Sequence, residues 1–367
     1  MGALSDFFGD LKVLLAAATA KPPPPDEIAS FGLLVEQNAQ TYPAEIAIIC
    51  EGETVTWQEL NERANRIASL LSSQGIRQGD CVSLFMQNRI EFVVQLLGIT
   101  KLGAIGGLIN TNLTKQQLNH CITLTESKKC IFGEELTAEL NEIREELSLQ
   151  DGADYLFVRD QGTEPAPNWA VEVDSKDATM DHSNPTEEVA IGNTACYIFT
   201  SGTTGLPNAA RFSHRRLIPT AAMGAGLVLR INQNDRMYNC LPLYHGTGLA
   251  IGLATAFTAG ASTVLRRKLS VTAFWDDVKQ HNCTCFVYIG EFLRYLLSQP
   301  ESPQDKENTV RAIIGNGLRP DIWHTFKDRY DIDRIGEFYG ASEGNAGFAN
   351  VFNKDCTVGL GTAPAII

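Results

Sequence analysis

The stretch Ala195-Cys-Tyr-Ile-Phe-Thr-Ser-Gly-Thr-Thr-Gly-Leu-Pro207 places a loop of glycines and hydroxyl side chains directly after a short apolar run. The apolar run at 195–199 predicts a buried strand. Gly202 and Gly205 let the backbone turn tightly and approach an anion, and the hydroxyl and amide groups of the loop can converge on phosphate oxygens. The loop is therefore a candidate phosphate-binding loop, with a plain turn as the alternative. It is not the Walker pattern, because the lysine followed by serine or threonine is absent.

Strand-like and helical patterns alternate along the rest of the chain. This alternation predicts an α/β fold with parallel sheets and crossover helices. One helix is marked by the capping box Thr56-x-x-Glu59 and can end at Gly75, and its apolar face carries Leu60, Ala64, Ile67, Ala68 and Leu71. A second helix is expected at 91–101. Strands are expected at 45–50, 82–86, 104–109, 195–199, 237–240, 262–265, 284–289, 311–314 and 335–338. The polar stretch 159–188 is interpreted as a connection between two subdomains.

Charge and cysteine content narrow the class of protein. With 367 residues and 44% hydrophobic composition, the chain can bury a substantial core. Its 30 basic and 43 acidic residues give a formal charge of −13, which argues against nucleic acid as the main partner. A local basic cluster, Arg211, Arg215 and Arg216, could still meet phosphates. The nine cysteines fit a reducing compartment, and Cys283-x-Cys285 is interpreted as core strand rather than as a zinc site.

The N-terminal segment, residues 1–30, contains an apolar stretch at 11–20. This stretch is too short to span a bilayer, which takes about 20 residues, and it lacks the basic start of a secretory signal. We expect it to pack on the domain, with peripheral membrane contact through an interfacial helix as the alternative. The expected location is intracellular, either cytoplasmic or peripherally associated with a membrane.

Two further loops follow expected strands, at the carboxyl ends where open α/β sheets bind ligands. In Tyr339-Gly-Ala-Ser-Glu-Gly-Asn345, Tyr339 offers an aromatic face for a nucleobase, and Glu343 offers a carboxylate oxygen of the kind that Mg²⁺ prefers. Gly315-Asn-Gly317 could let a flat ring lie against bare backbone, with a simple glycine turn as an equal alternative.

These three loops, in this order, resemble the motifs of the adenylate-forming superfamily of acyl-CoA synthetases, peptide-synthetase adenylation domains and luciferases. That resemblance rests on Tyr197-Ile-Phe-Thr-Ser-Gly-Thr-Thr-Gly-Leu-Pro207. The chain looks closest to the fatty acid transport protein / very-long-chain acyl-CoA synthetase family, through Gly107-Leu-Ile-Asn-Thr-Asn-Leu113, Leu241-Pro-Leu-Tyr-His-Gly246 and Gly336-Glu-Phe-Tyr-Gly-Ala-Ser-Glu-Gly-Asn345. This resemblance implies that residues 31–367 form the large N-terminal domain of the adenylate-forming fold, with two mostly parallel sheets flanked by helices.

The resemblance also implies roles for individual residues. The ATP phosphates would lie against Thr200, Ser201, Gly202, Thr203, Thr204 and Gly205, with Thr200 and Glu343 assisting Mg²⁺. Adenine would be held by Gly315, Asn316, Gly317, Tyr339, Gly340 and Ala341, and Ser342 and Glu343 complete the nucleotide-binding set. His245 would lie near the acyl carboxylate or at the mouth of its tunnel, although a lone histidine is more often structural.

The implied reaction is ATP-dependent ligation of a long- or very-long-chain fatty acid to the co-substrate CoA, through an acyl-adenylate. No nucleophilic side chain is required, because the main tasks are alignment and neutralisation of charge. Two other functions share the motifs. One is a fatty acid uptake or trapping factor at a membrane, with ligation secondary or lost. The other is an adenylation domain that loads a carrier protein.

Two departures from the family pattern modify these expectations. Asn208 stands where the family usually has lysine after the loop proline, so weaker handling of pyrophosphate is expected, with Arg211 as a candidate replacement for the charge. The sequence also ends before the expected ribose-binding aspartate, hinge and small C-terminal domain. We therefore expect a truncated chain that is inactive alone but retains weak, Mg²⁺-dependent affinity for ATP or AMP.

Overall fold

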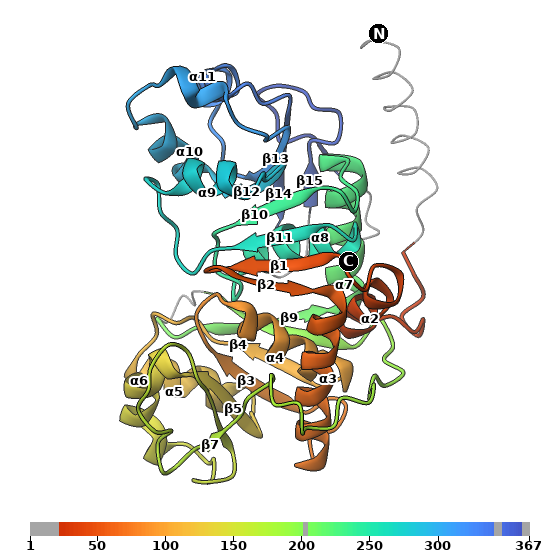
Figure 1. Cartoon of the computed structure of the whole chain (residues 1–367), viewed down its shortest axis with the longest axis vertical. Helices are drawn as coiled ribbons and strands as arrows, with labels where there is room; N and C mark the ends of the chain where they lie inside the picture. The colour runs from red at the N-terminus through yellow and green to blue at the C-terminus, as the bar shows by residue number, and fades with distance from the viewer. Residues whose placement is uncertain (1–21, 201–204, 341–346, 362–367) are drawn as a thin grey trace.

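Short apolar runs form the strands of two sheets in this computed structural model, which describes residues 22–200, 205–340 and 347–361 (Figure 1). The seven-stranded sheet has the order β7-β6-β5-β3-β4-β8-β9. Its strands are β3 (Cys81–Phe85), β4 (Ile105–Leu108), β5 (Lys129–Gly133), β6 (Tyr155–Val158), β7 (Val171–Glu172), β8 (Thr194–Thr200) and β9 (Asn208–Ser213). All neighbours in this sheet are parallel except β8 and β9.

The nine-stranded sheet has the order β16-β15-β14-β13-β12-β10-β11-β1-β2. Its strands are β1 (Ile46–Cys50), β2 (Glu53–Thr56), β10 (Arg236–Asn239), β11 (Ser262–Leu265), β12 (Cys285–Ile289), β13 (Ala312–Asn316), β14 (Arg334–Gly340), β15 (Gly347–Ala349) and β16 (Leu360–Gly361). The centre of this sheet is parallel and its two edges are antiparallel. The predicted α/β fold with two mostly parallel sheets is confirmed.

Helices connect the strands, and the best-marked one follows its sequence signals closely. The helices are α2 (Phe31–Thr41), α3 (Trp57–Ser73), α4 (Ile90–Lys101), α5 (Lys115–Leu124), α6 (Thr137–Ile143), α7 (His214–Met223), α8 (Thr255–Thr258), α9 (Phe274–Gln280), α10 (Gly290–Leu297) and α11 (Pro320–Tyr330). The described ranges also contain two π-helical segments, η3 (Gly224–Leu229) and η4 (Thr247–Ala254), and three 3-10 turns, η1 (Glu134–Leu136), η2 (Arg144–Glu146) and η5 (Pro303–Lys306). The predicted capping box of α3 is present, because Thr56 and Glu59 each bind the other's backbone N–H.

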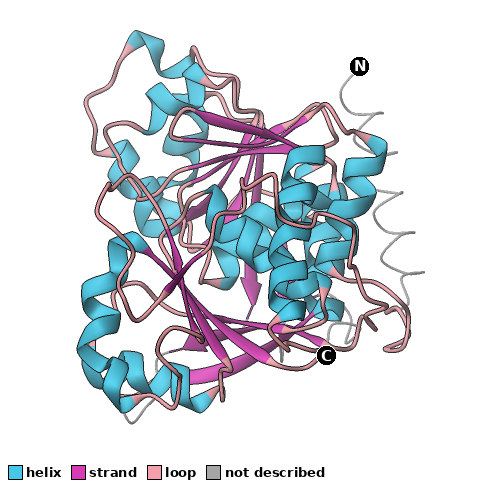
Figure 2. Ribbon diagram, turned by 60° about the horizontal axis from the view of Figure 1, so that its bottom comes forward, coloured by secondary structure: helices cyan, strands magenta, loops and turns pink. Residues whose placement is uncertain are grey.

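Helices lie between the two sheets as well as outside them (Figure 2). The central core joins the inner faces of both sheets to the apolar sides of α3, α4 and η4, with Leu84, Leu97 and Val287 among its members. A second core packs aromatic side chains of α11 against the nine-stranded sheet, and a third packs α5 and α6 against the seven-stranded sheet. The layers therefore run helix, sheet, helix, sheet, helix.

The chain changes from one sheet to the other at places that the sequence did not mark. β1 and β2 come first in the chain but pair beside β11 of the nine-stranded sheet. The stretch 159–188 contains β7 and is followed by β8, and both strands belong to the seven-stranded sheet. This stretch therefore connects parts of one sheet, and the passage to the nine-stranded sheet runs from β9 through α7 and η3 to β10.

The cysteines are free, and all are buried except Cys356. Cys283 and Cys285 are fully buried beside or within β12, as predicted for core strand. Within the described ranges, none of the helices combines the length and the hydrophobicity that a bilayer crossing requires. The N-terminal apolar stretch at 11–20 lies outside the described residues.

Candidate functional site

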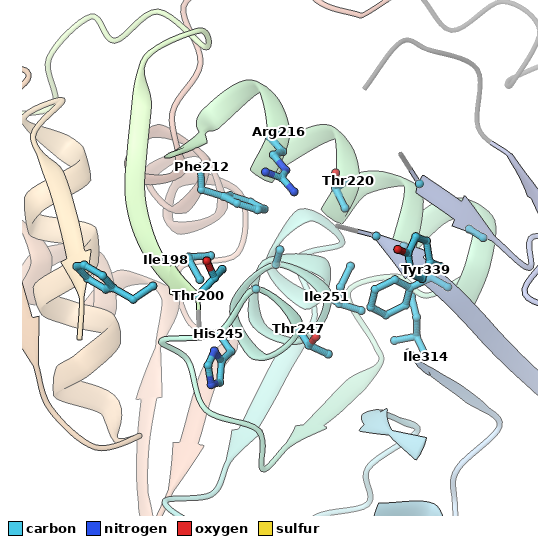
Figure 3. A pocket seen from close by; sticks show the side chains of 18 of the residues that line it. Ile198, Thr200, Phe212, Arg216, Thr220, His245, Thr247, Ile251, Ile314 and Tyr339 are labelled. Atoms are coloured by element: carbon cyan, nitrogen blue, oxygen red, sulfur yellow. The ribbon is translucent and has the colours of Figure 1, made fainter. Parts of the chain in front are cut away.

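A cavity of about 660 Å³ lies between the two sheets, beside the carboxyl ends of β8 and β14 (Figure 3). The seven-stranded sheet contributes Ile198, Phe199, Thr200 and Phe212, the nine-stranded sheet contributes Ile314, Phe338, Tyr339 and Phe348, and α7 contributes Arg216, Thr220 and Met223. Most of the lining is apolar. Among the described lining residues there is one arginine, Arg216, with no lysine, aspartate or glutamate.

Both ends of the candidate phosphate loop reach this cavity. Thr200 ends β8 and pairs with Asn208, the first residue of β9, so the loop closes an antiparallel hairpin. Gly205 has a φ of +85°, and a side chain there would meet nothing within 4 Å. Glycine is therefore required for its backbone conformation rather than for space. The Gly205 carbonyl accepts a hydrogen bond from Gln117 Nε2 at 3.1 Å, which ties the loop to α5.

The predicted loop at 315–317 is largely strand. Gly315 and Asn316 extend β13 and pair with Tyr288 and Ile289 of β12. A Cβ on Gly315 would lie 2.2 Å from the Tyr288 carbonyl oxygen, so close packing of the strands explains this glycine. Its neighbour Ile314 lines the cavity, whereas the three predicted adenine contacts Gly315, Asn316 and Gly317 do not.

Glu337, which sequence analysis missed, lies behind the end of β13. Its carboxylate is 3% exposed and accepts hydrogen bonds from the Tyr288 hydroxyl at 2.6 Å and from the backbone N–H groups of Gly317 and Leu318. Burial raises the pKa of Glu337 above its ordinary value. This side chain fixes the end of β13 relative to β14, next to the cavity wall.

Tyr339 forms the aromatic part of the cavity rim. Its side chain is 57% exposed at the end of β14, where it faces Phe348 of β15 with ring centroids 6.2 Å apart. Gly340 follows and also lines the cavity. The sequence motif marks Tyr339 but not Phe348, because the short strand β15 carries no recognisable local signal. In the sequence β15 is only the tripeptide Gly-Phe-Ala, and its pairing with the end of β14 becomes visible in the structure.

His245 lies at another edge of the cavity, before η4 (Figure 3). Its ring contacts the ring of Tyr244 with centroids 4.7 Å apart, and partial desolvation lowers the pKa of the His245 imidazole. Its carbonyl oxygen accepts an α-helical hydrogen bond from Leu249 N at 2.9 Å, near the start of η4. A mostly neutral imidazole at the cavity edge is compatible with the predicted place near an acyl group.

The cavity thus brings together Thr200, Gly205, His245, Tyr339 and Gly340 from the predicted set. The predicted residues Ser201, Gly202, Thr203, Thr204, Ala341, Ser342 and Glu343 lie outside the described residues. Their roles stay predictions. Arg216 and Thr220 belonged to no predicted site, and Arg216 was named only as part of a basic cluster. Arg216 and Thr220 reach the cavity because α7 packs against it, and no local sequence pattern shows this packing.

The Mg²⁺ prediction rests on one described residue. Thr200 lines the cavity with a hydroxyl oxygen, a donor that suits a hard cation, while Glu343 is not described. In the described part of the chain, no group of three or more histidine, cysteine, aspartate or glutamate side chains gathers as a metal site.

The AMP-binding enzyme family matches residues 35–364 of the chain. The chain is 36% identical over 342 residues to the medium/long-chain-fatty-acid–CoA ligase FadD6 of Mycobacterium tuberculosis, covering 93% of this chain and 55% of that protein. It is 37% identical over 326 residues to long-chain fatty acid transport protein 2 of Rattus norvegicus, covering 88% and 52%. The chain spans about half the length of these curated relatives.

Solved structures show the same fold. An anthranilate CoA ligase, AuaEII, in complex with anthranoyl-AMP has a TM-score of 0.81 at 19% identity, covering 95% of this chain and 66% of that chain. ATP-bound MatB from Rhodopseudomonas palustris has a TM-score of 0.76 at 23% identity, covering 90% and 64%. The predicted resemblance to adenylate-forming enzymes and to fatty acid transport proteins is confirmed. The chain belongs to the AMP-binding enzyme family.

Proposed function

We propose that this chain carries the ATP and fatty acid site of an AMP-forming acyl-CoA ligase. The observation that carries the proposal is the one cavity that joins the ends of the candidate phosphate loop to an apolar wall. Thr200 and Gly205 lie on the loop side, and Met223, Val228 and Ile314 belong to the wall. A nucleotide and an apolar acid could meet there, and the relative named as a fatty-acid–CoA ligase supports this choice.

The proposed reaction has two steps. An oxygen of the fatty carboxylate attacks the α-phosphorus of ATP, a C–O–P linkage forms, and the bond to pyrophosphate breaks with its electron pair leaving on pyrophosphate. The CoA thiolate then attacks the acyl carbonyl, a thioester forms, and AMP leaves. Because anions approach one another in the first step, orientation and neutralisation of charge are the main tasks of the protein.

The described residues divide these tasks between them. The exposed ring of Tyr339, with Phe348 beside it, offers a stacking face for adenine. Glu337 holds the end of β13 against the same wall. Thr200 would hold Mg²⁺ together with the predicted ligand Glu343, which lies outside the described residues, and the cation supplies positive charge to phosphate oxygens when it is bound. His245 borders the cavity on the side proposed for the acyl carboxylate.

The test is calorimetric titration of ATP with Mg²⁺ into the purified chain. Acid-dependent pyrophosphate release and thioester formation are then assayed with the family's C-terminal domain supplied, because the chain alone is expected to be inactive. Replacing Tyr339 by alanine should weaken ATP binding about tenfold, since stacking of a base on an aromatic ring contributes about 1–3 kcal/mol. Tyr295→Ala is the matched control, because Tyr295 is 45% exposed on α10 and lies outside the cavity lining. Equal ATP affinity in both variants would remove Tyr339 from the site.

The uptake role and the carrier-loading role predict different results in these assays. Relatives named as long-chain fatty acid transport proteins keep the uptake or trapping role as a second candidate. Fatty acid binding without ATP turnover would favour that role, and peripheral membrane association through residues 1–30 would be tested with lipid vesicles. Adenylate formation with no transfer to CoA would favour a carrier-loading domain. Thioester formation without membranes would favour the ligase.

A further inference from the structure

Three neighbouring arginines follow the phosphate loop, and the structure directs their guanidinium groups to different places. Arg211 donates to Thr194 Oγ1 from Nε at 3.1 Å and from Nη2 at 2.9 Å, on the edge of the seven-stranded sheet. Arg215 donates from Nε to the Pro23 carbonyl at 2.9 Å, and so holds the chain that precedes α2. Arg216 lines the large cavity. The sequence alone shows no difference between the three.

The fold orients Arg216 through its neighbours on α7. Ser213 caps the helix and accepts a hydrogen bond from Arg216 N at 3.2 Å, so the side chain leaves from the first turn. Its guanidinium carbon lies 4.4 Å from the centroid of the Phe212 ring, a cation–π contact. Thr220, one turn later, lines the same cavity, and Figure 3 shows Arg216 pointing into the space between Phe212 and Thr220.

Asn208 is neutral and does not supply a positive charge to this cavity. It pairs with Thr200 across the hairpin, is exposed, and is not among the lining residues. Arg211 is exposed and held at Thr194. Of the described residues around the cavity, the fixed positive charge belongs to Arg216, and Thr200 and Gly205 of the loop ends lie in the same lining.

We propose that Arg216 is an anion-binding residue of this cavity, which holds an oxyanion of a substrate. The inference rests on the proposed function and deepens it. A guanidinium offers parallel N–H donors that match the oxygens of a phosphate or a carboxylate, and a largely apolar surrounding strengthens such a charged hydrogen bond. As the bond to pyrophosphate breaks, positive charge placed here stabilises the electron pair that moves onto the leaving group.

The oxyanion has two chemical sources, which share this recognition. The loop ends favour a phosphate of ATP. The wall of α7 and η3 beyond Thr220, with Met223 and Val228, would also suit the start of an acyl chain whose carboxylate meets the guanidinium. The experiment therefore titrates ATP and the fatty acid hexadecanoate separately. A third ligand, adenosine, reports nucleoside binding that involves no anion.

The test compares Arg216→Gln with Arg211→Gln, which removes the same charge five residues earlier and outside the cavity. We expect Arg216→Gln to weaken ATP binding about tenfold or more, since hydrogen bonds to charged groups are the strong ones. Adenosine affinity should stay within about twofold, because its recognition uses no ion pair. Arg216→Lys should recover part of the loss, and Arg211→Gln should match the unmodified chain. Added salt should weaken ATP binding by the unmodified chain more steeply than by Arg216→Gln.

Each outcome decides something. A selective loss of ATP affinity assigns the oxyanion to phosphate, and a selective loss of hexadecanoate affinity assigns it to the carboxylate; both support an anion-binding role. Unchanged affinity for ATP and hexadecanoate in Arg216→Gln, while the unmodified chain binds both, overturns the inference and leaves the proposed function standing. An unmodified chain that binds neither ATP nor adenosine overturns the proposed function and the inference with it. Thermal unfolding of Arg216→Lys separates loss of fold from loss of the anion contact.

Discussion

Two cavities of this molecule differ in the number of charged side chains among their described lining residues. The larger one, of about 660 Å³, is mostly apolar and has Arg216 as its described fixed cation. The smaller one, of about 320 Å³, is rich in charge. It is lined by Arg63, Arg89, Arg159, Lys176 and Arg267 together with Glu51, Glu53, Glu91, Asp160, Glu172 and Asp174.

The charges of the smaller cavity face one another. Arg267 lies 2.7 Å from Asp160 and 2.6 Å from Glu51 between nitrogen and oxygen, and Arg159 lies 2.6 Å from Glu172. Arg267 follows β11 of the nine-stranded sheet, whereas Asp160 follows β6 of the seven-stranded sheet. The Arg267–Asp160 pair therefore joins the parts of the chain that build the two sheets, whereas the other two pairs lie within the part that builds one sheet. We therefore interpret the charge-rich cavity as structural. The mostly apolar cavity, in which Arg216 is the one cation among the described lining residues, is the candidate for ligands.

We expect the larger cavity to respond to acid through a buried histidine. The wall of the larger cavity is anchored by His214, the first residue of α7, which is fully buried and accepts a hydrogen bond from Phe31 N at Nδ1. Burial lowers the pKa of His214 to about 4, so the folded chain keeps the imidazole neutral while the unfolded chain protonates it near pH 6.5. The stability that this group contributes is present above pH 6.5 and is lost as the pH falls to 4. The loss is about 3 kcal/mol.

Urea unfolding at pH 7 and at pH 4.5 would measure this loss in the unmodified chain and in His214→Gln. Glutamine can still accept from Phe31 N and does not titrate, so we expect its stability to fall less with acid. His324→Gln is the control, because that side chain is 62% exposed. Parallel acid profiles for the unmodified chain and His214→Gln would show that the cavity wall does not depend on a neutral histidine.

Arg267 allows the ion pairs of the smaller cavity to be tested in the same way. Arg267→Met should destabilise the fold by about 2 kcal/mol, because breaking a buried pair costs roughly 3–5 kcal/mol and these side chains keep some contact with water. The exposed fraction is 17% for both Arg267 and Asp160. The added change Asp160→Leu should recover part of the loss, since it removes the unpaired carboxylate. Chemical unfolding measures both variants, and calorimetry should show unchanged ATP affinity. Weaker ATP binding would break the distinction between the two cavities.

Local sequence signals predicted the helices and strands whose formation depends on residues that are near one another in the chain. The capping box of α3 and its apolar face need only residues within one helix, and the buried strands of the parallel sheets are short apolar runs. The strand β9 was missed because it is an exposed edge, with one buried residue, Phe212. Its polar sequence resembles a loop until it pairs with β8. The extension of β13 through Gly315 likewise depends on Tyr288 of the neighbouring strand.

Site residues were predictable where the sequence placed them after a strand, and not where the tertiary fold selects them. Tyr339 and Thr200 end strands and line the cavity, as expected from their motifs. Arg216 and Phe348 reach the same cavity through the packing of α7 and the pairing of β15 with β14, which involve residues far apart in the chain. Charge alone could not separate Arg216 from Arg211, since the difference lies in what each side chain contacts.

The smallest expected effect tests whether the loop at the larger cavity has a role beyond folding. Gly205→Ala and Gly152→Ala make the same change at glycines with φ of +85° and +70°, where a Cβ would meet nothing within 4 Å. Each should destabilise the fold by about 1 kcal/mol, because alanine is strained in the left-handed region. Gly152 lies outside the cavity lining, so only Gly205→Ala should also weaken ATP binding, by a few fold, as the loop backbone shifts away from the phosphates. Thermal unfolding and ATP titration measure the two effects separately. If both variants lose stability equally and bind ATP equally, the loop is a plain turn. The larger cavity would then bind ATP without help from the loop.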